Sequence, residues 1–150
     1  ITKDDIVVGF SASGTTPFVL SILKHCRKEG IPTGCIVNNP HSPIAEWADY
    51  EVEVITGPEF VTGSTRMKAG TSQKLILDMI STTLQIRQGR VEGNKMVNAK
   101  LINHKLIDRA CRIFMERNSE YKDYEEVRQL ILKAGSVKKA EMMISRHFDM

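Results

Sequence analysis

A cluster of hydroxyl side chains follows the first apolar run of the sequence. Residues 11–17 (SASGTTP) carry four hydroxyls within six positions, directly after the apolar residues 6–10 and directly before a stretch with helical spacing. Hydroxyls and backbone N–H groups at a helix start lie at the positive end of the helix dipole, which suits a phosphate with about two negative charges. Gly14 lets the backbone approach such a ligand without a Cβ in the way. The segment is therefore a candidate phosphomonoester site.

The same residues also have a simpler interpretation as a helix cap. Ser and Thr are common N-cap residues, and Pro17 suits the first turn of a helix. The sequence has no GxGxxG or GxxxxGK[ST] pattern, which disfavours dinucleotides and nucleoside triphosphates as ligands. From these residues alone, a cap and a phosphomonoester site both remain open.

A second loop rich in glycine and hydroxyls covers residues 57–71 (GPEFVTGSTRMKAGT) and opens the longest helical pattern of the sequence. Arg66 can donate a forked pair of hydrogen bonds to a phosphate or to neighbouring sugar hydroxyls. Glu59 could act as a general acid or base if burial raised its pKa, but one glutamate alone does not define such a site. The alternative is again a helix cap, with Arg66 and Lys68 facing solvent.

These loops need a scaffold, and the apolar pattern predicts a parallel α/β fold. Short β-branched runs at residues 6–10, 33–37 and 50–55 alternate with a helix that begins at Pro17 and stops at Gly30, and then with a short helix. Strand, helix, strand in this order is typical of a parallel sheet, which gathers loops at the carboxyl ends of its strands.

The second half of the sequence predicts helices. A long helix over residues 66–90 has apolar residues that indicate burial on more than one side, and a second helix covers residues 99–117. Two short amphipathic helices follow, joined by Gly135 as a C-cap and Ser136 as an N-cap. Long helices of this kind also predict a homodimer, in which they pack across a two-fold axis.

We therefore predict two domains, residues 1–117 and a small helical unit over residues 118–150. Asn103 and Lys105 fall on the helix 99–117, where a spacing of two residues puts them on different flanks. Taken alone, they read as ordinary exposed polar residues.

Composition excludes several other classes of protein. The net charge is +3, with basic and acidic residues interleaved, which argues against a nucleic-acid surface. No apolar stretch reaches the ~18 residues of a membrane helix, and no secretory leader is present, so we expect a soluble cytoplasmic protein without a membrane partner. Three scattered cysteines and four histidines without metal-like spacing predict no metal site, and we expect no cofactor.

Several strings resemble the N-acetylmuramic acid 6-phosphate etherases. They lie in residues 9–19 (GFSASGTTPFV), 38–46 (NNPHSPIAE), 57–79 (GPEFVTGSTRMKAGTSQKLILDM), 89–97 (GRVEGNKMV) and 103–106 (NHKL). The likeness covers about residue 5 to residue 117, and it implies the later portion of a sugar isomerase (SIS) domain. That fold is a three-layer α/β sandwich with a parallel sheet, followed here by a small helical subdomain.

The resemblance also implies a ligand and a reaction. The ligand is an amino-sugar phosphate, bound by Ser11, Ser13, Thr15, Ser64, Arg66, Asn103 and Lys105. The reaction removes D-lactate from the 3-position of N-acetylmuramic acid 6-phosphate and adds water, giving N-acetylglucosamine 6-phosphate. In the family the two catalytic groups are glutamates of the N-terminal half, upstream of Ile1. We therefore expect no catalytic residue in residues 1–150, and no turnover by these residues alone.

Two alternatives of other classes remain. The glucokinase regulatory protein of animals is similar to the etherases and binds fructose phosphates without catalysis, so a sugar-phosphate-binding regulatory module is the alternative function. An aldose–ketose isomerase of the same fold is a third hypothesis, which the string GSTRMK at residues 63–68 disfavours.

Overall fold

The computed structural model describes residues 1–148, which divide into two compact units. Unit 1 contains Ile1–Ile80 and unit 2 contains Ser81–Met150. Each unit has its own hydrophobic core, so each is described by itself.

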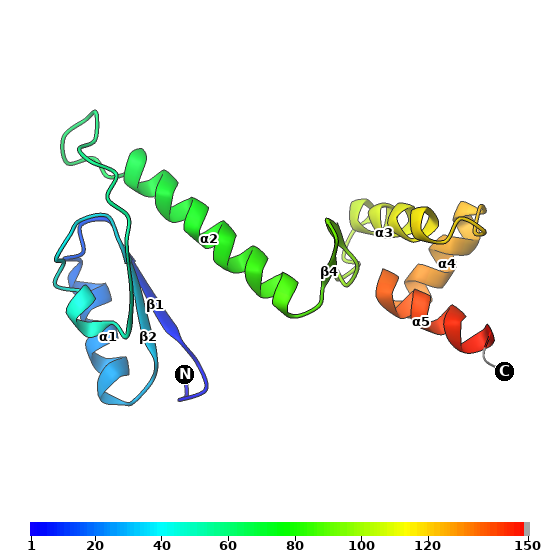
Figure 1. Cartoon of the computed structure of the whole chain (residues 1–150), viewed down its shortest axis with the longest axis horizontal. Helices are drawn as coiled ribbons and strands as arrows, with labels where there is room; N and C mark the ends of the chain where they lie inside the picture. Colours follow the sequence, from blue (N-terminus) through cyan, green and yellow to red (C-terminus); the bar gives the residue numbers. More distant parts are fainter. Residues whose placement is uncertain (149–150) are drawn as a thin grey trace. The chain divides into compact units, whose positions relative to one another are not determined.

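Unit 1 is built on a parallel three-stranded sheet (Figure 1). Its strands are β1 (Val7–Ser11), β2 (Thr33–Val37) and β3 (Tyr50–Glu53), in the order β1-β2-β3. Helix α1 (Pro17–Lys28) connects β1 to β2, and the short helix η1 (Ala45–Trp47) lies between β2 and β3. Parallel neighbours need such crossovers. The predicted parallel α/β fold is thus confirmed.

The central strand β2 fixes the core of unit 1. All five of its residues are buried, as expected for a short run of β-branched and small residues between two strands. Cys35 and Val37 pack with Leu23 of α1 and with Ile44, all at 1% exposure or less. Helix α1 comes so close to β1 that a Cβ on Gly9 would lie 2.6 Å from the Val19 side chain. The start of α1 is therefore held directly above the carboxyl end of β1.

Helix α2 (Lys68–Arg87) leaves most of its apolar side chains exposed. Leu75, Met79 and Leu84 are more than half exposed, and Ala69 is the buried residue of the helix. The expectation that this helix is buried on more than one side is therefore wrong for the described residues of this chain. The pattern shows that the helix is apolar, but it does not show what covers it.

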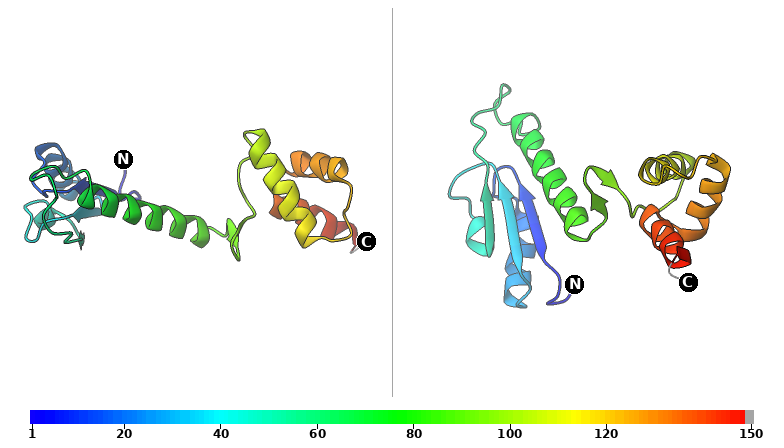
Figure 2. Two further views of the ribbon diagram at one scale, coloured as in Figure 1. Left: turned by 90° about the horizontal axis from the view of Figure 1, so that it is seen from above. Right: turned by 45° about the vertical axis from the view of Figure 1, so that its right-hand side comes forward.

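Unit 2 contains a short hairpin and three helices (Figure 2). Strands β4 (Val91–Glu92) and β5 (Lys95–Met96) pair antiparallel, and the sequence analysis did not predict them. The helices are α3 (His104–Arg117), α4 (Tyr124–Ala134) and α5 (Val137–Phe148). The three helices pack around a single hydrophobic core, in which Phe114, Val127 and Ile131 are fully buried. The edge-on contact of Phe114 with Tyr121 adds to it.

The ends of these helices follow the expected cap chemistry. Asp123 accepts hydrogen bonds from the N–H groups of Glu125 and Glu126 at the start of α4. Gly135 has a φ of 82° and closes α4 in the left-handed conformation, while the Ser136 hydroxyl accepts from the N–H of Lys139. The predicted joint between the last two helices is confirmed.

Helix α3 begins later than predicted. Residues 99–103 are not helical, and Asn103 is the N-cap in an extended conformation, with a φ of −154°. Asn103 therefore precedes the helix, and Lys105 lies in its first turn. Packing also groups α3 with α4 and α5 in unit 2, whereas the sequence analysis grouped it with residues 1–117. Within residues 1–148, no helix combines the length and the apolar character that crossing a membrane requires.

Candidate functional site

The hydroxyl-rich segment forms a tight turn at the carboxyl end of β1. The Ser11 hydroxyl accepts from the N–H of Gly14 at 3.0 Å and lies 2.8 Å from the Thr16 hydroxyl, with which it shares a hydrogen bond. The Ser13 and Thr15 hydroxyls are 2.9 Å apart and also share a hydrogen bond. Ser11 is buried, whereas Ser13 and Thr15 are exposed. The turn thus presents two linked hydroxyls to solvent on a fixed backbone.

The start of α1 is not capped by a side chain. The N-cap residue is Thr16, and it makes no side-chain capping hydrogen bond. Its hydroxyl is engaged with Ser11 instead. The cap interpretation of the hydroxyls therefore fails at Thr16, and the positive end of the helix dipole is free to attract an anion beside the exposed hydroxyls.

The loop that follows β2 holds this turn in place through hydrogen bonds. The carbonyl of Ala12 accepts from the N–H of Asn38 at 3.1 Å and from the side-chain amide of Asn39 at 2.9 Å. The carbonyl of Gly14 accepts from the N–H of Ile44 at 3.1 Å. Three hydrogen bonds from one neighbouring loop therefore fix the shape of the turn.

Ser42 of the same loop packs directly against Gly14. A Cβ on Gly14 would lie 2.1 Å from the Cβ of Ser42, and the φ of Gly14 is 69°. Both the close approach and the positive φ require glycine. The buried Ser42 hydroxyl has no hydrogen-bond partner among the described residues.

Asn38 links the turn to the start of α2. Its side-chain amide donates to the carbonyl of Val54 at 2.9 Å and to the hydroxyl of Ser72 at 2.8 Å. Its side-chain oxygen accepts from the amide of Gln73 at 2.9 Å. Because the backbone N–H of Asn38 also donates to the carbonyl of Ala12, one buried residue connects the turn at residues 11–16 to the start of α2.

Glu59 caps α2 and is not set up as an acid or base. Its carboxylate accepts from the N–H groups of Lys68 at 3.0 Å and Ala69 at 3.1 Å. The N–H of Lys68 is the main reason that the pKa of Glu59 is lowered. The raised pKa that a general acid would need is therefore not found at this carboxyl.

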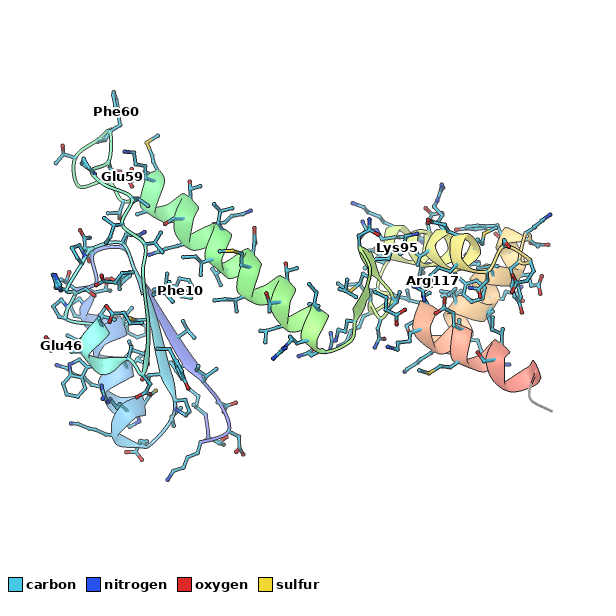
Figure 3. All side chains as sticks on the ribbon, viewed as in Figure 1. Phe10, Glu46, Glu59, Phe60, Lys95 and Arg117 are labelled. Atoms are coloured by element: carbon cyan, nitrogen blue, oxygen red, sulfur yellow. The ribbon has the colours of Figure 1, made fainter. Side chains whose placement is uncertain are left out.

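The loop between Glu59 and α2 presents Ser64 and Arg66. Ser64 is half-buried, and Arg66 is exposed. Phe60 projects from the loop with 93% of its surface exposed (Figure 3). Arg66 is thus available to a ligand, close in sequence to the capped start of α2.

Asn103 and Lys105 belong to unit 2. The Asn103 side-chain oxygen accepts from the N–H of Leu106 at 2.9 Å, which leaves the amide hydrogens of Asn103 for a ligand. Lys105 is exposed in the first turn of α3. The predicted site residues therefore form three groups: the turn with Ser11, Ser13 and Thr15, the loop with Ser64 and Arg66, and the start of α3.

The chemistry that these groups offer is anion and sugar binding by neutral donors and cations. Among the residues whose side chains are described, no three His, Cys, Asp or Glu side chains gather closely enough to hold a metal ion. Burial raises the pKa of the Cys35 and Cys111 thiols, which favours the protonated and unreactive form.

A family model described as "SIS domain" matches residues 1–82, and the chain belongs to that family. The curated relatives that the chain matches include three proteins with the name N-acetylmuramic acid 6-phosphate etherase. The protein of Bacteroides thetaiotaomicron is 54% identical over 98% of this chain and 52% of its own length. The protein of Porphyromonas gingivalis is 55% identical over 92% and 50%, and that of Christiangramia forsetii is 53% identical over 93% and 50%. The chain thus spans about half the length of these relatives.

Sequence reasoning missed the residues that organise the turn. Asn38 and Ser42 lie in the string 38–46 that carries the family resemblance, but neither is assigned a role from the sequence. Thr16 is one of the four clustered hydroxyls but is not among the predicted site residues. A polar residue directly after a buried strand was the signal available for Asn38, since such a side chain lies at the same sheet edge as the turn.

Proposed function

We propose that the full-length protein is an N-acetylmuramic acid 6-phosphate etherase, a carbon–oxygen lyase, and that residues 1–150 supply part of its amino-sugar phosphate site. The observation that carries the proposal is the uncapped start of α1 with exposed Ser13 and Thr15 beside it, tied through Asn38 to the start of α2. The names of the relatives agree with this ligand class.

In this proposal the turn at residues 11–16 binds one anionic part of the ligand. The Ser13 and Thr15 hydroxyls share one hydrogen bond, so the hydroxyl that accepts it donates its own proton to this anionic part. The N-terminal dipole of α1 stabilises the charge. Ser11 is buried and holds the turn through Gly14 and Thr16, so its role is to shape the site. Ser64 and Arg66 contact the sugar, and Asn103 and Lys105 reach the ligand, with Lys105 directed to the phosphate.

The reaction needs a base that removes the proton beside the open-chain aldehyde and an acid that protonates the departing ether oxygen. Two carboxyl groups with tuned pKa values suffice for both steps. Glu59 is unsuited to the acid step because backbone N–H groups hold its pKa low. As the resemblance to the etherases implies, we place both catalytic glutamates outside residues 1–150, and we expect these residues alone to release no lactate.

We further propose a homodimer, in which the exposed apolar side chains of α2 are covered by a second subunit. Leu75 and Leu77 are 53% and 49% exposed and two positions apart, so they lie on different flanks of the helix. Exposed apolar area of this extent is typical of an interface. The proposed location is the cytoplasm, which agrees with three free buried cysteines.

The test uses the full-length protein and N-acetylmuramic acid 6-phosphate, with D-lactate measured by a coupled dehydrogenase. Release of D-lactate together with N-acetylglucosamine 6-phosphate is the expected result. If the sugar phosphate raised the melting temperature but no product formed, the etherase hypothesis would be rejected in favour of the regulatory module. Conversion of an aldose phosphate to a ketose would identify an isomerase.

A further inference from the structure

The hairpin of unit 2 has one acidic side chain, and both of its oxygens are engaged. Oε2 of Glu92 accepts from Nη2 of Arg117 at 2.7 Å, and Oε1 lies 3.2 Å from Nζ of Lys138. Arg117 belongs to α3 and Lys138 belongs to α5. One carboxylate therefore joins the hairpin to two helices.

This carboxylate is the centre of a wider network of charges. Arg117 also donates from Nε to Glu141 at 2.7 Å, and Nζ of Lys138 donates to the carbonyl of Gly89 at 3.4 Å. The side chains of Glu92, Arg117, Lys138 and Glu141 are only 22–36% exposed. Figure 3 shows Arg117 on α3 and Lys95 on the hairpin, where Lys95 pairs with Glu116. Salt and water screen the charge–charge interactions of a partly buried network less than those of an isolated surface pair.

The hairpin in turn fixes the chain that leads to Asn103 and Lys105. Val97, directly after β5, is fully buried, and its carbonyl accepts from the backbone N–H of Lys138 at 3.0 Å. Its own N–H donates to the carbonyl of Arg90 at 2.9 Å. Five residues separate this anchored position from the N-cap of α3.

Apolar packing holds this connecting segment at Leu101, which packs against the core of unit 2, but leaves space beside it. A cavity of about 180 Å³ lies against it, lined by Ala99 and Leu101 of the segment and by Leu106, Ala110 and Val137 of the helices. Side chains that border an empty space lack contacts on that side. The position of the segment therefore depends on the anchors at its two ends, the hairpin and the Asn103 cap, together with Leu101.

We propose that Glu92 is a positioning residue for the sugar-phosphate site. By holding the hairpin against α3 and α5 through Arg117 and Lys138, it sets where the segment 97–105 presents Asn103 and Lys105 to the ligand. The proposal rests on the proposed function, because it requires that Lys105 contacts the phosphate. Glu92 itself touches no substrate.

The variant Glu92→Gln keeps the shape of the side chain and removes its charge. The core of unit 2 contains Phe114, Val127 and Ile131 but not Glu92, so the helices retain their packing. The matched control is Asp108→Asn. Asp108 is also a carboxylate with two partners, accepting from Arg112 at 2.9 Å and from the Tyr124 hydroxyl at 3.0 Å, but it has no contact with the hairpin.

The experiment measures the Kd of N-acetylglucosamine 6-phosphate by calorimetry in the full-length protein. Lys105→Gln is expected to weaken binding by roughly tenfold, as the loss of one charge-assisted contact predicts. Glu92→Gln is expected to weaken binding by about three- to tenfold. The double variant should bind no more weakly than Lys105→Gln alone, because contacts that act through each other are not additive. Asp108→Asn should leave Kd unchanged.

The outcomes separate this proposal from the proposed function. An unchanged Kd in Lys105→Gln would remove Lys105 from the site and overturn the proposed role of this segment. Weaker binding by Lys105→Gln, together with a wild-type Kd in Glu92→Gln, would overturn only the positioning role of Glu92. Independent, additive effects of the two changes would also overturn it, because Glu92 would then act on the ligand by another route.

Hydrogen exchange gives a second measurement that does not depend on ligand binding. Amides of residues 97–105 should exchange faster in Glu92→Gln, while those of α4 keep their wild-type rate. Lys138→Gln removes one arm of the contact and should show a smaller increase. Should the exchange of residues 97–105 stay at the wild-type rate in both variants, Glu92 does not hold the segment.

Discussion

Alanine variants of Gly14 and Gly30 allow a direct measurement of how tightly the turn at residues 11–16 is packed. These two glycines flank the two ends of α1, and each has a φ of 69°. A Cβ on Gly30 would meet only the flexible end of Lys3 at 3.7 Å, which is an ordinary contact. A Cβ on Gly14 would lie 2.1 Å from the Cβ of Ser42 and 2.5 Å from its hydroxyl. The two alanine variants therefore share a backbone strain and differ in one clash.

The expected magnitudes follow from these distances. The left-handed conformation costs a non-glycine residue about 1–2 kcal/mol, so Gly30→Ala should lower the free energy of unfolding by that amount. Overpacking in a closed space adds about 1–3 kcal/mol, which makes Gly14→Ala the more damaging change by about that margin. Replacing Ser42 by glycine in the Gly14→Ala background should recover most of the difference, because the clashing atoms are gone.

Urea unfolding of the 150-residue chain, followed by the fluorescence of its single tryptophan, is the assay. Trp47 lies in η1 and packs partly against the core of unit 1, so its signal reports this unit. Equal losses in Gly14→Ala and Gly30→Ala, within about 0.5 kcal/mol, would refute the packing of Gly14 against Ser42, since distant single changes add to within this error. No recovery on removal of the Ser42 side chain would refute it as well.

Three further predictions concern the residues around the turn. Replacing Asn38 by alanine should cost about 1–3 kcal/mol in urea unfolding, because the amide partners at Val54 and Ser72 lose a buried donor; a loss below about 0.5 kcal/mol would contradict the linking role of Asn38. The folded pKa of Glu59 lies below its ordinary value of 4.5, so its stabilising effect is present above that value and is lost as the pH falls through the folded pKa. Glu59→Gln should therefore flatten the acid side of a stability–pH curve, and an unchanged curve would contradict the cap. Arg66→Ala in the full-length protein should weaken sugar-phosphate binding by about 1.5–3 kcal/mol by calorimetry, and an unchanged Kd would remove Arg66 from the site.

The sheet of unit 1 was predictable from the sequence because its signals are local. The run over residues 33–37 is β-branched or small at every position, and the structure buries every position. Gly30 and Gly135 end helices as the cap rules require, with φ values of 69° and 82°. The start of α3 was not predictable in this way, because the apolar residues before Asn103 continue the helical spacing. In the structure, Val97 is held by backbone hydrogen bonds to Arg90 and Lys138, and residues 99–103 are not helical.

The parts of the candidate site that were missed depend on contacts between distant residues. Asn38 bonds to Ser72 and Gln73, which lie 34 and 35 positions further along the chain. No periodicity or motif encodes such a pairing. The same limit explains Glu59, whose carboxylate reaches N–H groups nine and ten positions away and thereby changes from a candidate acid into a cap.

The two ends of helix α2 differ in how far the described residues explain them. Its first turn is defined by polar contacts within unit 1, where Glu59 bonds to Lys68 and Asn38 bonds to Ser72. Further along, Met79 and Leu84 are 60% and 52% exposed, so nothing among the described residues accounts for their apolar character. Because exposed apolar area is costly in water, these side chains are expected to be covered when the whole protein assembles. The fixed end would then place Arg66 at the ligand, while the exposed end would place the helix in the proposed dimer, so one element would connect substrate binding to assembly.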